Sequence, residues 1–173
     1  MAFTVQNDTG TQAAANSYDT VANFKSYHDD RGNSYAGKGD GEIQAAMVKA
    51  TDFVDNHYLY NGTRLVADQT TEFPREDLTD AEGNSVTGVP TQVKEATYEY
   101  ALQSLNGVPL EIDTTASTGN RLVKRKRTKV GEIETETEFD DPSYSGQPVF
   151  TRPDNMLLNS GFVANAGSNK SYR

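Results

Sequence analysis

Apolar residues recur at helical spacing in three stretches of the first two thirds of the chain. Residues 42–58 carry the clearest apolar stripe, and the opposite face of that stretch is polar and charged. Residues 21–31 follow Thr20, a favourable N-cap, and residues 91–106 are followed by Gly107, which favours helix termination. The pattern predicts three helices that pack side by side into a small bundle.

The stretch between the second and third predicted helices, residues 59–88, has a weaker pattern. Asn61-Gly62, Phe73-Pro74 and Glu82-Gly83-Asn84 are turn signals that interrupt it. A stretch of this length is too long for a plain connector, so we expect it to wrap the helices.

A strongly charged segment follows the helices. Six basic residues lie between positions 121 and 129, and glutamates alternate with Ile, Thr and Phe from 132 to 139. Strict alternation predicts a β-hairpin with Gly131 in the turn. A two-residue loop would pair Lys129 with Glu132, Arg127 with Glu134, Arg125 with Glu136, Thr128 with Ile133 and Leu122 with Phe139. A slightly longer loop stays open, because valine at position 130 is unfavourable in a type I′ turn.

The last segment of the chain contains three prolines and one short possible helix at residues 153–159. Alone it would be poorly ordered, so we expect an extended arm that orders only on an assembled partner or a neighbouring copy. The predicted fold class is mainly α, a small helical bundle with a projecting charged β-hairpin and an extended C-terminal arm. The expected parts are a helical core at 1–112, the hairpin at 113–140 and the arm at 141–173.

The net charge of the chain argues against a protein whose main function is to bind the phosphate groups of nucleic acids. The chain has 16 lysines and arginines against 25 acids, a net charge of −9, and only 35% of its residues are hydrophobic. We interpret the basic run as neutralised by the glutamates that follow it. A weak role of Lys124 and Lys126 in DNA binding stays open. The lean hydrophobic content favours a subunit that completes its burial between neighbours.

No residue pattern supports catalysis or a bound cofactor. The chain has no cysteine, which excludes thiolate metal sites and thiol nucleophiles. His28 lies beside two aspartates and His57 lies near Asp52 and Asp55, without a convincing ligand spacing. We therefore expect no enzymatic activity, no metal and no cofactor. The N-terminus lacks the pattern of a signal peptide, and no apolar run reaches the length of a membrane span.

Several segments, taken in order, resemble one family of tailed-phage proteins. They are residues 27–33, 45–55, 58–64, 73–75 and 89–105. The resemblance is to the proteins usually labelled "DnaT-like single-stranded DNA-binding protein", whose gene products look like head–tail adaptors of the connector. The family commonly has Trp where this chain has Phe73. The family-motif residues that we expect to maintain the bundle are Tyr27, Asp30, Arg31, Gly32, Phe73, Pro74 and Arg75.

The resemblance implies two different functions. An adaptor would form a ring, by family likeness a dodecamer, below the portal protein in the neck of the virion, after assembly in the host cytoplasm. It would extend the DNA channel, dock a tail-completion or tail protein, and let double-stranded DNA pass without specific binding or any membrane contact. A primosome-like protein would instead bind single strands through basic and aromatic residues. Because the net charge is strongly negative, we favour the adaptor.

Overall fold

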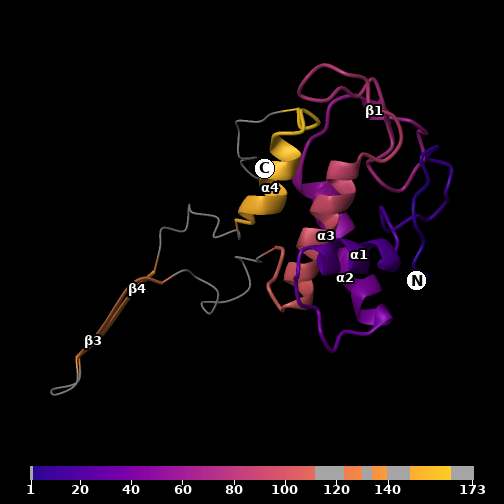
Figure 1. Cartoon of the computed structure of the whole chain (residues 1–173). Helices are drawn as coiled ribbons and strands as arrows, with labels where there is room; N and C mark the ends of the chain where they lie inside the picture. Colours follow the sequence, from indigo (N-terminus) through magenta and orange to yellow (C-terminus); the bar gives the residue numbers. More distant parts are fainter. Residues whose placement is uncertain (1, 112–122, 130–133, 140–148, 165–173) are drawn as a thin grey trace. The chain divides into compact units, whose positions relative to one another are not determined.

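The computed structural model describes residues 2–111, 123–129, 134–139 and 149–164 (Figure 1). The fold is mainly α, and strands in this part of the chain form only two two-stranded antiparallel ladders. The chain divides into a helical unit, residues 1–108 with 149–173, and a second unit, residues 109–148. The elements in chain order are α1 (Val21–Asp30), α2 (Asp40–His57), β1 (Thr63–Arg64), β2 (Arg75–Glu76), α3 (Thr91–Leu105), β3 (Val123–Lys129), β4 (Glu134–Phe139) and α4 (Thr151–Leu158).

The first three helices begin and end within two residues of the predicted positions because local signals set their limits. Thr20 caps α1, its Oγ1 accepting a hydrogen bond from Asn23 N–H at 3.2 Å. Gly32, at φ +65°, ends α1 in a left-handed turn in which its N–H donates to Asp29 O at 3.1 Å. At α2, Gly39 N–H donates to the Glu42 carboxylate at 3.0 Å, and Pro90 precedes α3.

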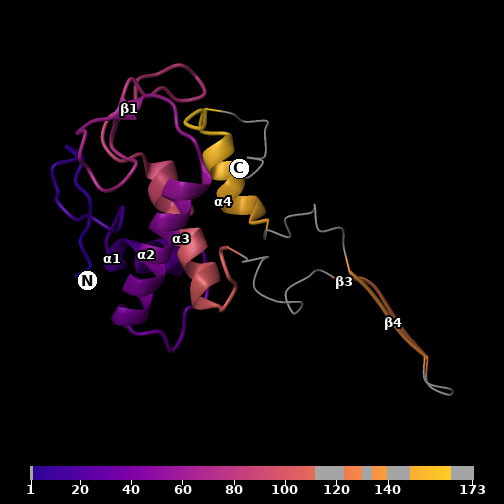
Figure 2. The ribbon, with the colours of Figure 1, turned by 180° about the vertical axis from the view of Figure 1, so that it is seen from behind.

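Helix α3 is the central helix of the helical unit. It packs against α2 on one side and α4 on another, and it also contacts α1; Figure 2 shows the same arrangement from behind. Its residues 96–102 are all buried. Every helix and the loops contribute to the core, whose largest fully buried side chains include Tyr18, Phe24, Ile43, Met47, Phe73, Tyr100, Leu157 and Phe162.

The segment 149–164 differs from the extended arm that we expected. It forms α4, close to the predicted short helix, and both Leu157 and Phe162 are buried in the core. Beyond the helix, Asn61 N–H donates to Phe162 O at 2.8 Å and Ala164 N–H donates to Leu59 O at 2.7 Å. These residues therefore belong to the helical core, because burying their apolar side chains outweighs the cost of ordering the segment. The rest of the expected arm, 141–148 and 165–173, lies outside the described residues.

The hairpin forms, but its register differs from the predicted one by two residues. The Cα partners are Lys129 with Glu134, Arg127 with Glu136, Arg125 with Glu138, Thr128 with Thr135, Lys126 with Thr137 and Val123 with Phe139. Four residues, 130–133, connect the strands, so Glu132 and Ile133 lie in the connection and outside the described residues, as does Leu122. A register irregularity lies between Val123 and Arg125. The longer connection removes the need for valine in a two-residue turn.

Candidate functional site

The Phe-Pro-Arg family motif holds the loops of residues 59–76 together. Phe73 is fully buried, with its ring centroid 4.6 Å from that of Tyr60 and 5.9 Å from that of Tyr18. A cis peptide bond joins it to Pro74, which is also buried. These contacts give the aromatic residue a packing role.

Arg75 joins the same loops through hydrogen bonds to their backbone. Its side chain is only 9% exposed, and its guanidinium donates to Asn61 O and Gly62 O, each at 2.8 Å. It also pairs with the Glu72 carboxylate. Gly62 is required here, since its φ is +72° and a Cβ would lie 2.1 Å from Glu76 O. Arg75 is thus occupied by the protein's own backbone and is not presented to a ligand.

Two of the other family-motif residues, Tyr27 and Arg31, attach the end of α1 to α3. Tyr27 is buried, and its hydroxyl donates to Glu99 Oε1 at 2.9 Å. The Arg31 guanidinium lies 3.5 Å from the centroid of the Tyr27 ring and 3.8 Å from Glu95 Oε1. Asp30 is exposed at the last position of α1. These contacts fix the position of α1 against α3. The Tyr27 hydroxyl and the Arg31 guanidinium both have partners within the fold.

Two acidic residues that the sequence did not single out attach α4. Asp154 accepts hydrogen bonds from the hydroxyls of Tyr58, at 2.9 Å, and Tyr100, and from Phe150 N–H at 3.0 Å. Burial raises the pKa of both tyrosines, so each remains a neutral hydrogen-bond donor. Tyr58 is 96 residues from Asp154 in the chain, so no local spacing could have revealed the pair.

Glu99 is the second of these acids, and it is 6% exposed. Its Oε1 accepts from Tyr27 and lies 2.8 Å from Arg152 Nε, so side chains of α1, α3 and α4 meet at one carboxylate oxygen. The buried charge is compensated by the guanidinium and the hydroxyl together. This cluster explains how α4 is held, and it uses the carboxylate for structure.

Two of the titratable residues named in the sequence analysis, His28 and Asp55, have hydrogen-bond partners within the fold. His28 is buried, with Nε2 3.1 Å from Tyr98 O and Nδ1 3.1 Å from the Asn33 amide nitrogen. Burial lowers the pKa of His28, and these partners fit a neutral ring with its proton on Nε2. Asp55 accepts from the Tyr18 hydroxyl and from a backbone N–H, and burial raises its pKa to about 7. The described residues contain no cluster of three potential metal ligands.

The surface of the helical unit is acidic. Residues 2–108 and 149–164 contain 17 acidic and eight basic side chains, a formal charge of 8 − 17 = −9. Six of the eight basic side chains take part in ion pairs: Lys25, Arg31, Lys38, Arg64, Arg75 and Arg152. The unit therefore offers few positive charges to a polynucleotide.

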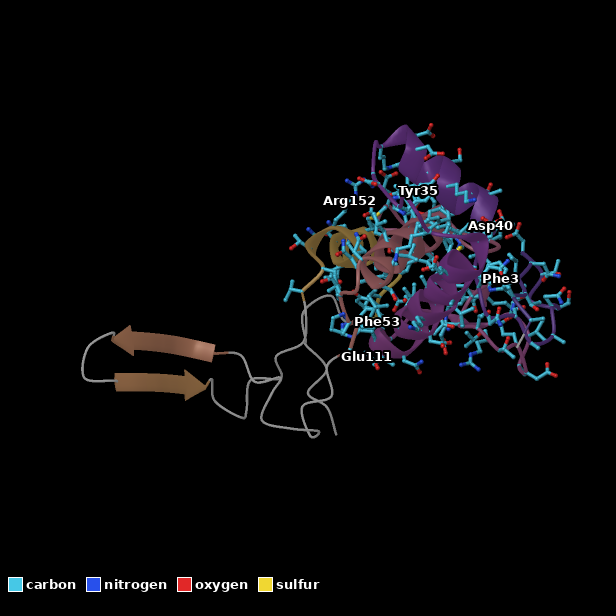
Figure 3. All side chains as sticks on the ribbon, turned by 90° about the horizontal axis from the view of Figure 1, so that it is seen from below. Phe3, Tyr35, Asp40, Phe53, Glu111 and Arg152 are labelled. Carbon is cyan, nitrogen blue, oxygen red and sulfur yellow. The ribbon has the colours of Figure 1, made fainter. Side chains whose placement is uncertain are left out.

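Most aromatic rings of the described residues are buried. Of the 13 aromatic residues whose side chains are described, 11 are buried, including Tyr58 and Tyr60. The other two, Phe3 and Tyr35, are partly exposed and lie in different regions of the unit (Figure 3). Tyr35 also donates its hydroxyl to Asp29 at 2.7 Å. Among these residues no group of exposed rings forms a stacking platform.

Comparison with known proteins identifies the family. The model of the family described as "Putative DnaT-like ssDNA binding protein" matches residues 1–173. The chain belongs to this family. No curated protein and no solved structure matches this chain. The match confirms the resemblance to the DnaT-like family, and it extends beyond the segments that carried that resemblance. Within the described residues, no helix is long and apolar enough to cross a membrane.

Proposed function

We propose that this protein is a structural subunit of the head–tail adaptor ring of a tailed phage. Copies of the chain would surround the DNA channel below the portal protein, by family likeness as a dodecamer, and would dock a tail-completion or tail protein. The subunit would be part of the virion neck after assembly in the host cytoplasm. This function requires neither catalysis nor a cofactor.

One observation carries the proposal, namely that the described residues of the helical unit, 2–108 and 149–164, combine a formal charge of −9 with aromatic rings that are mostly buried. Affinity for nucleic acids depends on basic side chains that release counterions, and single-strand binders add exposed rings. A channel benefits from the opposite properties, because an acidic lining repels phosphates and leaves no adhesive site for passing DNA.

Single-stranded DNA binding is the second candidate function, and two observations favour it. The family description names that activity, and β3 carries five basic residues within seven positions. Against it, three of these five, Arg125, Arg127 and Lys129, lie opposite glutamates in the register of the hairpin. A strand already opposed by carboxylates is a weak binding site for phosphates.

Fluorescence anisotropy of a labelled oligothymidylate separates the two functions. The adaptor predicts no saturable binding below micromolar protein concentration near physiological salt. The single-strand binder predicts tight binding that weakens steeply as salt is raised. Lys124→Glu/Lys126→Glu tests the two basic residues not opposed by glutamates, with Lys49→Glu/Lys94→Glu on the helical unit as the charge-matched control. Sub-micromolar binding lost only in the hairpin variant would contradict the adaptor proposal.

A further inference from the structure

The two strands of the hairpin carry opposite charge. Strand β3 contains five basic residues and no acid, whereas β4 contains three glutamates and no base. Within the described chain they form a two-stranded sheet, so each strand has one partner and one outer edge. The hairpin therefore has a basic edge strand and an acidic edge strand.

A two-stranded hairpin of this composition is a poor independent structure. Isolated two-stranded hairpins are marginal in water and normally need further strands or an apolar face packed on a core. The six residues from Lys124 to Lys129 are all charged or threonine, and so are the five from Glu134 to Glu138. Additional strands are therefore the more effective way to stabilise it.

We infer that the hairpins of neighbouring copies join edge to edge, with β4 of one copy pairing with β3 of the next. The inference rests on the proposed ring. Rotational symmetry about a ring axis gives every β3 the same direction and every β4 the opposite one, so each contact between copies is antiparallel, like the contact within the hairpin. The hairpins would together form a continuous up-and-down sheet around the axis.

Charge selects this arrangement over a two-fold dimer. A dimer made through equivalent edges would place β3 against β3 or β4 against β4, and like charges directly opposite each other are unfavourable. Head-to-tail pairing places the basic strand against the acidic one at every contact. Charges often protect an edge strand from pairing, but protection requires the same sign on both edges, and here the signs differ.

A charge-exchanged hairpin tests the pairing between copies separately from the pairing within one. The variant Arg125→Glu/Arg127→Glu/Lys129→Glu/Glu134→Arg/Glu136→Arg/Glu138→Arg retains opposite charges inside its own hairpin. Next to a wild-type copy, however, it would place acidic positions against acidic and basic against basic. The full-length variant and wild type are mixed unfolded, refolded together and assembled, with a tag on one of them. The composition of the recovered rings is then measured by native mass spectrometry.

We expect each protein to form rings with its own kind and mixed rings to be about tenfold or more below the statistical share. The control exchanges an ion pair of the helical unit, Lys25→Asp/Asp40→Lys, whose side chains lie 2.6 Å apart in the wild type, and should mix freely. Rings in which the hairpin variant and wild type mix at random would overturn the edge pairing and leave the proposed function intact. Absence of rings from wild type with portal present would instead overturn the proposed function.

Discussion

Leu157 provides the sharpest test of the finding that α4 completes the helical core. Its side chain has no exposed surface, whereas that of the adjacent Leu158 is partly exposed. Replacing a buried leucine with alanine costs about 2–5 kcal/mol, from lost transfer energy and from the cavity left behind. Typical domains are stable by only about 5–15 kcal/mol, so the loss is a large fraction of the total.

The assay is urea unfolding followed by far-ultraviolet circular dichroism. With a slope of about 2 kcal/mol per molar, a loss of about 3 kcal/mol lowers the midpoint for Leu157→Ala by about 1.5 M. Leu158→Ala removes the same atoms from a less buried position in the same helix and should shift the midpoint by less than half as much. Equal shifts for the two variants, or no shift for Leu157→Ala, would refute the account of α4 as part of the core.

Three further predictions concern the buried polar groups. Asp154→Asn should destabilise the protein by about 1–3 kcal/mol, because a neutral amide replaces a carboxylate that accepts three hydrogen bonds, whereas the exposed Asn155→Ala should not; thermal unfolding compares them. Because the pKa of Asp55 is raised to about 7 in the fold, the unfolding free energy of wild type minus that of Asp55→Asn should increase as pH falls from 8 to 5, and a flat difference would contradict this. The pKa of His28 is lowered in the fold. The unfolding free energy of wild type minus that of His28→Gln should therefore decrease as pH falls through 6.5.

The sequence predicted those parts of the fold that depend on neighbouring residues. Helical periodicity and local caps such as Thr20 and Gly32 are readable within a few positions, and the three longer helices lie where they were expected. The strands of the hairpin were equally readable from alternation. Their register was not, because charges that alternate with a period of two remain opposed when one strand shifts by two residues.

Long-range partners could not be predicted in the same way. The acceptors Glu99 and Asp154 carry no distinguishing local pattern, and their tyrosine partners are 54 or more residues away in the chain. The final segment was polar and proline-rich enough to suggest an arm, although Leu157 and Phe162 complete the core. Among the expected site residues, Phe73 packs against other rings and Arg75 donates to backbone carbonyls, whereas their role in maintaining the bundle stays a prediction.

Electron microscopy of this protein mixed with its proposed partner, a phage portal protein, tests the central claim most directly. The adaptor account predicts a closed ring of copies seated on one end of the portal, coaxial with its channel, and present without added nucleic acid. Particles in which the portal remains bare, while the protein is recovered as monomers or along single-stranded DNA, would contradict it.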